Sequence, residues 1–124
     1  MRRQKYWWWG KVKAIIYRYG KTGFDKGRHI ATIKIVSFDR EVIRKEISKM
    51  PEELREYAAV THAISETLSK DAGSDRLMVV RRVLMDQTHT LEGAAHLVPC
   101  HYKTALQYQN EFIKLVAWYL SLVS

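Results

Sequence analysis

Residues 30–36 (Ile-Ala-Thr-Ile-Lys-Ile-Val) have the run of β-branched residues that is typical of a β-strand. The chain contains no second run of comparable quality, so a strand formed here has no partner in the same molecule. From residue 39 onward the apolar residues recur every three or four positions, which is the spacing of amphipathic helices. The sequence therefore predicts an all-α domain of about five helices, with residues 30–36 extended or paired with another copy.

The amino-terminal part predicts a basic helix followed by a connection. Residues 6–19 have helical apolar spacing with lysine and arginine between, and Gly20 is a typical helix end. Residues 21–28 are polar, basic and contain two glycines, which predicts a flexible linker. The expected organisation is a tryptophan-rich helix over 1–20, a linker or extended arm over 21–38 and a helical domain over 39–124.

Caps and breakers set the expected helix boundaries in the middle of the chain. Asp39 is expected to cap a helix over 40–49, and Pro51 to end it and occupy the first position of the next. That helix is expected to reach about Lys70, after which Asp71-Ala-Gly73 breaks it. Ser74 or Asp75 is then expected to cap a helix whose buried residues are Leu77, Met78, Val80, Leu84 and Met85.

The last part of the chain has the spacing of a helix-turn-helix, at about residues 90–120. Thr90 is a good cap for a short helix over 91–97, Val98-Pro99-Cys100 interrupts it, and a long helix is expected over 101–120. Ala95 and Ala105 are small where the two helices would cross. This arrangement fits both a DNA-reading unit and a structural helix pair.

In the DNA-reading interpretation, the outer face of the long helix enters a major groove. Lys103 can donate to a guanine edge or a phosphate, and Gln107 and Asn110 can pair with adenine. Free backbone donors at the start of this helix can hold a phosphate. The residues expected to read bases are His101, Tyr102, Lys103, Gln107 and Asn110, and those expected to contact phosphates are Thr90, Thr104 and Lys114.

The charge distribution also favours a polyanionic partner. The chain has a formal net charge of +8, and residues 1–50 carry 14 Lys and Arg against 4 Asp and Glu, whereas residues 51–124 carry 7 against 9. The long helix alone therefore supplies little electrostatic affinity for DNA, and either a homodimer or the amino-terminal basic residues would add to it. These residues are Arg2, Arg3, Lys5, Lys11, Lys13, Lys21, Lys26 and Arg28.

Other classes of protein find little support. No apolar run approaches the ~20 residues of a membrane span, and the start lacks the pattern of a signal peptide. Cys100 is the single cysteine, expected to be buried or half-buried, and it fits a reducing cytoplasm. His89, His96, Cys100 and His101 lack the paired short spacing of a zinc site. No paired carboxylates and no phosphate-cradling glycine loop are present, so we expect neither an enzyme, a metal nor a cofactor.

Three consecutive tryptophans, Trp7–Trp9, cover most of the circumference of a helix. At least one of them must then remain exposed in a monomer. Three interpretations are open: Trp8 anchors the helix in the core, the cluster contacts a protein partner or a second copy, or the basic helix lies on a membrane surface. The first of these is favoured.

Several segments carry a resemblance to a known family. The sequences at 59–64 (AVTHAI), 75–77 (DRL), 88–95 (THTLEGAA), 102–105 (YKTA) and 111–117 (EFIKLVA), with Trp7–Trp9 before a basic helix, resemble the RinA/ArpU-type transcriptional regulators of phages and prophages. The resemblance implies an all-helical fold with a sigma-factor-like helix-turn-helix, in which residues 91–97 support and residues 101–114 read DNA. It also implies activation of phage genes in the bacterial cytoplasm, at the nucleoid, through a contact with host RNA polymerase.

Two other functions remain open from the sequence. A small terminase-like packaging subunit also uses a basic helix-turn-helix, and it would assemble into a ring on phage DNA. A helical protein-interaction module would show no DNA affinity, whereas DNA binding should weaken steeply as salt rises.

Overall fold

The computed structural model describes residues 6–30 and 39–123, with side chains for 6–21 and 39–123. Within these residues the chain forms six α-helices, one π-helical turn and no strand, which confirms the prediction of an all-α domain of about five helices preceded by an amino-terminal helix. The elements are α1 (Trp9–Ile30), α2 (Arg40–Ser48), α3 (Glu52–Leu68), α4 (Gly73–Val80), η1 (Arg81–Met85), α5 (Leu91–Leu97) and α6 (Tyr102–Tyr119).

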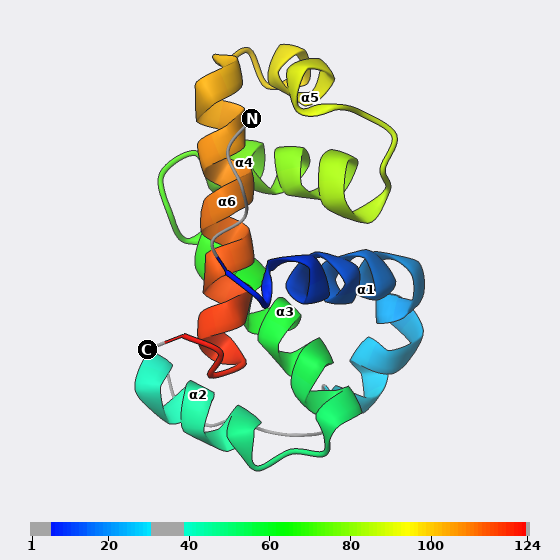
Figure 1. The fold of residues 1–124 in the computed structure, drawn as a ribbon, viewed down its shortest axis with the longest axis vertical. Helices are drawn as coiled ribbons and strands as arrows, with labels where there is room; N and C mark the ends of the chain where they lie inside the picture. Colours follow the sequence, from blue (N-terminus) through cyan, green and yellow to red (C-terminus); the bar gives the residue numbers. More distant parts are fainter. Residues whose placement is uncertain (1–5, 31–38, 124) are drawn as a thin grey trace.

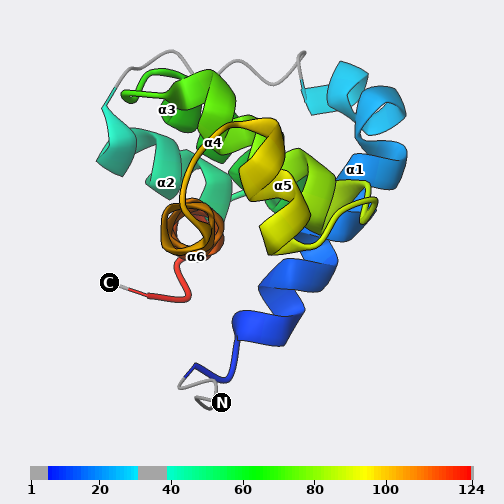
Figure 2. The same cartoon turned by 90° about the horizontal axis from the view of Figure 1, so that it is seen from above.

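Helix α6 runs along the long axis of the molecule and organises the other helices (Figure 1). Its carboxyl-terminal half packs with α1 and α3 in the main core, where Val12, Ile16, Val60, Phe112 and Val116 are almost fully buried. Each such side chain contributes about 1.5–3 kcal/mol through the removal of apolar surface from water. Helix α5 lies beside the beginning of α6 and α2 beside its end (Figure 1). Viewed from above, α6 appears end-on with α5 next to it (Figure 2).

The predicted end of the first helix at Gly20 is wrong, because α1 continues to Ile30. The predicted linker over 21–28 is therefore helical. Gly20 marks a close approach instead: a Cβ at this position would lie 2.6 Å from the Cβ of Met85 in η1. The glycine thus serves helix packing rather than helix termination. The strand or extended arm expected at residues 30–36 begins at the last residue of α1 and otherwise lies outside the described residues.

The tryptophan cluster divides between the core and the surface. Trp8 and Trp9 are 2% and 7% exposed, so the prediction that Trp8 anchors the helix in the core is confirmed. The ring of Tyr6 stacks on Trp8 with centroids 4.9 Å apart. Trp7, in contrast, is 78% exposed.

Of two predicted helix caps in the middle of the chain, one is confirmed and the other is wrong. Asp39 caps α2 as expected, with its carboxylate accepting a hydrogen bond from the Glu41 amide at 2.9 Å. Helix α4, however, begins at Gly73 after Ala72 in the left-handed region (φ 57°), so the predicted cap by Ser74 or Asp75 is wrong. Residue 73 must be glycine at this helix start, since a Cβ there would lie 2.5 Å from the Leu68 carbonyl oxygen.

Smaller differences concern single residues. Pro51 is the N-cap of α3 rather than its first residue. The helix expected to run through Met85 instead passes into η1, where the Asp86 amide donates to the Arg81 carbonyl at 2.7 Å, five residues back. Val80, Leu84 and Met85 are buried as predicted, Leu77 is half-buried, and Met78 is exposed.

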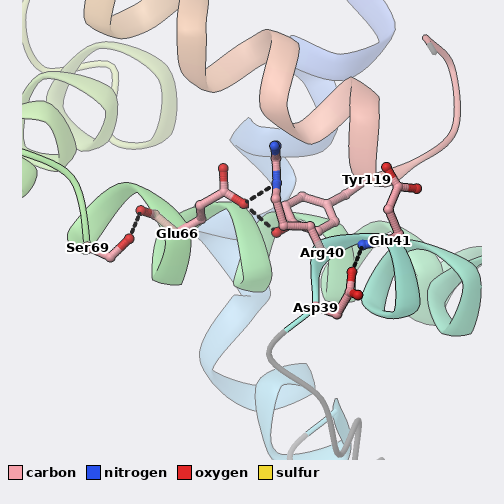
Figure 3. Close-up of polar contacts among 6 residues, drawn as sticks. All are labelled: Asp39, Arg40, Glu41, Glu66, Ser69 and Tyr119. Atoms are coloured by element: carbon pink, nitrogen blue, oxygen red, sulfur yellow. Dashed lines mark hydrogen bonds and ion pairs between the residues drawn. The ribbon is translucent and has the colours of Figure 1, made fainter.

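A polar cluster joins α2 to α3 and to the end of α6. Glu66 Oε1 accepts hydrogen bonds from Arg40 Nε at 3.0 Å and from the Tyr119 hydroxyl at 2.7 Å (Figure 3). The guanidinium groups of Arg40 and Arg44 both lie over the Trp118 ring, 4.5 and 4.6 Å from its centroid. These contacts fix the short helix α2 against the last turn of α6.

Candidate nucleic-acid interface

A second, smaller apolar cluster holds α4, α5 and α6 together. It consists of Val79, Ala94, Ala95, Val98 and Ala105. Ala95 and Ala105 are 6% and 0% exposed, as their small size at the expected crossing predicts. The half-buried Cys100 and Tyr108 pack against this cluster. The predicted helix pair is thus present, with its inner face sealed by its own residues and by Val79 of α4.

Helix α5 begins where the sequence predicts. The Thr90 hydroxyl oxygen accepts a hydrogen bond from the Gly93 amide at 3.1 Å, which satisfies one of the unpaired donors of the first turn. The exposed Thr90 hydroxyl keeps its proton available for a phosphate oxygen.

The turn between α5 and α6 leaves the beginning of α6 open. His101 is the N-cap in extended backbone conformation, and its side chain makes no capping hydrogen bond. The Cys100 amide donates to the Ala95 carbonyl at 3.0 Å, which closes the turn behind the helix start. The backbone amides of the first turn of α6 therefore make no hydrogen bond to the N-cap side chain.

The outer face of the first half of α6 is exposed. One turn of helix separates Lys103 from Gln107, and both side chains are open to solvent. Of the eight residues predicted to contact DNA, five on α6 or at its start are exposed and two are half-buried. The exposed ones are His101, Tyr102, Lys103, Gln107 and Lys114, the half-buried ones are Thr104 and Asn110, and the eighth, Thr90, is exposed at the start of α5.

Two of the predicted base readers make hydrogen bonds within the protein. Gln107 Nε2 donates to Glu111 Oε2 at 2.9 Å, and Gln109 Nε2 donates to Asn110 Oδ1 at 3.3 Å. Glu111 was not singled out in the sequence, although its spacing of four residues from Gln107 places the two side chains on one helix face.

The Glu111 carboxylate is also paired with a cation from α4. Arg76 Nη1 lies 3.0 Å from Glu111 Oε1. Burial raises the pKa of Glu111, but hydrogen bonds from Gln107 and Arg76 and the charges of Arg76 and Lys70 lower it more, so the net pKa lies below its ordinary value. Glu111 is thus ionised at neutral pH, and Arg76 offsets the repulsion it would exert on a phosphate.

The amino-terminal segment meets the far end of this face. Lys114 Nζ lies 5.9 Å from the centroid of the Tyr6 ring. The sequence did not indicate this contact between Tyr6 and Lys114. Helix α1 adds exposed cations, Lys11, Lys13 and Lys21.

The amino-terminal part contains one more described cation, which is not among the basic residues predicted to contact DNA. Arg18 of α1 forms an ion pair with Glu56 at 3.5 Å. Arg2, Arg3 and Lys5 lie outside the described residues, and so do the side chains of Lys26 and Arg28.

Alternative kinds of site receive no support from the described part of the chain. Among residues 6–21 and 39–123 no group of three or more His, Cys, Asp or Glu side chains is placed to hold a metal ion. In the same described part, no helix combines the length and apolarity that crossing a bilayer requires. A groove of about 490 Å³ between α1 and α3 has side chains of both charges, including Arg18, Lys21 and Glu52.

Comparisons with family models, with curated proteins and with solved structures found no match for this chain. The candidate interface is a helix pair with a sealed inner face and an exposed outer face on the first half of α6.

Proposed function

We propose that this protein binds double-stranded DNA in a sequence-specific manner through α5 and α6. The observation that carries the proposal is the contrast between the two faces of α6 near its beginning. Ala105 is fully buried against α4 and α5, whereas Lys103 and Gln107 are exposed on the opposite side. A helix supported in this way and bare on its outer face has the form required to enter a major groove.

The chemistry of the exposed residues assigns their roles in this proposal. Lys103 donates to a guanine edge or a phosphate, and Gln107 and Asn110 pair with adenine. His101 and Tyr102 flank these readers at the start of the helix. Phosphate contacts come from Thr90, Thr104, Lys114 and the open backbone amides of the first turn of α6.

Helix α1 supports the proposal by its charge. Lys11, Lys13 and Lys21 are exposed, and the first fifty residues carry a net charge of +10. The basic residues of this part of the chain would supply the sequence-independent affinity that the nearly neutral remainder lacks.

The biological role rests on the sequence resemblance. Regulation of phage or prophage transcription, with activation through host RNA polymerase, stays a prediction of the resemblance to RinA/ArpU-type regulators. A homodimer would double the contacts to DNA and would favour a target with two related half-sites.

Selection of bound sites from random DNA duplexes tests the proposal. The wild type is expected to enrich one motif, and the double variant Gln107→Ala, Asn110→Ala is expected to lose preference at the adenines within it. Ser65→Ala, an exposed change on α3, serves as the control and should leave the motif intact. Failure of the wild type to enrich any motif would contradict sequence-specific binding.

Two further measurements separate the alternative functions. A large closed ring in size-exclusion chromatography with light scattering would favour a packaging subunit, whereas a monomer or dimer favours a regulator. Absence of any salt-dependent DNA affinity would favour a protein-interaction module, for which the exposed Trp7 would be the first contact to test.

A further inference from the structure

The side chain of Gln107 has a restricted orientation before any DNA is bound. Its Nε2 atom donates to Glu111 Oε2 at 2.9 Å. An ionised carboxylate can only accept hydrogen bonds, so the amide nitrogen of Gln107, and never its oxygen, must face Glu111. This leaves Oε1 and the second N–H of the same amide for a ligand on the outer face of α6.

Glu111 is itself held in place from α4. Its other carboxylate oxygen, Oε1, lies 3.0 Å from Arg76 Nη1. Arg76 in turn donates from Nε to the Asp71 carbonyl at 2.9 Å, and its guanidinium lies 4.7 Å from the centroid of the Tyr108 ring. With both ends of its guanidinium engaged, Arg76 provides a fixed point for the carboxylate.

The free atoms of Gln107 match one base edge. An amide that offers one acceptor and one donor side by side pairs with N6 and N7 of adenine, whereas guanine presents two acceptors in the major groove. A glutamine free to rotate its amide by 180° would not maintain this order of donor and acceptor. The carboxylate of Glu111 removes that freedom.

We propose that Glu111, anchored by Arg76, is a positioning residue that fixes the Gln107 amide for adenine and so sets the base preference at one position of the target. The inference rests on the proposed function, because it assumes that α6 reads DNA. It adds an acidic residue, which would ordinarily disfavour contact with a phosphate backbone, to the determinants of specificity.

Site selection with matched variants tests the inference. Wild type should prefer adenine at one position by roughly five- to a hundredfold, the range for one bidentate contact, and Gln107→Ala should lose that preference. Glu111→Gln, whose amide can both donate and accept, should lower it to about threefold or less at the same position only. Glu92→Gln on α5 removes the same charge from an exposed site and should leave the preference unchanged.

The possible outcomes separate this inference from the proposed function. If Gln107→Ala loses the adenine preference and Glu111→Gln keeps it, the positioning role is wrong while DNA binding stands. The same conclusion follows if Gln107→Ala keeps the wild-type motif, because Gln107 then reads no base. If the wild type selects no motif, the proposed function fails and the inference fails with it.

A measurement on the unbound protein does not depend on the folding of any variant. In NMR spectra of wild type, the side-chain amide signals of Gln107 should move as Glu111 is titrated, with a midpoint below the ordinary value for glutamate. Signals that do not respond to ionisation of Glu111 would overturn the inference directly.

Discussion

The hydroxyl group of Tyr119 donates a hydrogen bond to Glu66 Oε1 at 2.7 Å, which ties the last turn of α6 to α3 (Figure 3). Arg40 of α2 donates to the same oxygen at 3.0 Å. One carboxylate therefore joins three helices at the carboxyl-terminal end of α6, whereas the proposed base contacts lie near the beginning of that helix.

Tyr119→Phe is expected to lower the free energy of unfolding by about 1–3 kcal/mol, because it removes a hydrogen bond to a charged acceptor in a nearly buried position. Urea denaturation followed by circular dichroism measures the change. Tyr102→Phe, at an exposed residue on the same helix, is the control and should have little effect. Equal stability of the two variants would show that the Glu66 contact contributes nothing.

The free energy of unfolding is also expected to fall in alkali because of Tyr119. Burial, with the hydrogen bond to Glu66 and its charge, raises the pKa of Tyr119 to about 12, above its ordinary value of 10. The folded state thus holds this proton more tightly than the unfolded state. The contribution of protonated Tyr119 to the free energy of unfolding is therefore complete below pH 10 and is lost as the pH rises toward 12. Stability of wild type should fall more steeply over this interval than that of Tyr119→Phe.

Gly20→Ala is expected to destabilise the protein by about 1–3 kcal/mol, even though alanine favours helices. The new Cβ would lie 2.6 Å from the Cβ of Met85. Gly10→Ala is the matched control in the same helix, since a Cβ there meets nothing within 4 Å. The control should be neutral or stabilising by up to about 1 kcal/mol, and thermal or urea unfolding of both variants compares them.

The free energy of unfolding is expected to fall in mild acid because of His62. Burial lowers its pKa below the ordinary value of 6.5, so the unfolded state takes up a proton more readily than the folded state. The contribution of neutral His62 to the free energy of unfolding is complete above pH 6.5 and is lost as the pH falls through the folded-state pKa. His62→Gln should flatten this part of the pH profile of unfolding, whereas His96→Gln at an exposed position should not. A profile unchanged by His62→Gln would contradict the assignment.

Lys103→Ala and Lys114→Ala are each expected to weaken DNA binding and to reduce the slope of log affinity against log salt by about one, if each lysine neutralises one phosphate. A lysine that contacts a guanine would instead change the selected motif. Lys45→Ala removes the same charge from α2, at the other end of α6, and should leave the slope unchanged. Fluorescence anisotropy over a range of salt concentrations measures the DNA affinity of the three variants. An equal change of slope in all three would indicate only a loss of net charge and would contradict the proposed contacts.

The sequence predicted features that depend on local chemistry. Asp39 and Thr90 cap their helices because a side-chain oxygen two or three residues before an amide can reach it in any context. The helix pair at the end of the chain was predicted for a similar reason, since small and apolar residues at fixed spacing define its inner face.

The role of Gly20 depends on a residue that is distant in the sequence. The sequence predicts a helix end at Gly20, but the residue packed against it, Met85, is 65 positions away in the chain. At Gly73 the contact is local in sequence, because the Leu68 carbonyl five residues earlier leaves no room for a Cβ, and it depends on the path of the chain between α3 and α4. The spacing of residue types in the sequence predicts neither contact.

The candidate interface was predicted in outline but not in its polar detail. Exposure of the outer face of α6 follows from its apolar stripe, and five of its predicted contact residues are exposed. The pairing of Gln107 with Glu111 was accessible from their spacing, whereas Arg76 comes from α4, and the approach of Tyr6 to Lys114 depends on the path of the whole chain.

Helix α6 belongs to two packing units at once. Ala105 near its beginning lies in the small cluster with α4 and α5, while Phe112 and Val116 lie in the main core. In a fragment limited to α4–α6, Phe112 and Val116 would be exposed to solvent, because the residues of α1 and α3 that cover them would be missing. The helix pair α5–α6 is therefore not an independent folding unit, and a graft of it into another protein would also need α1 and α3.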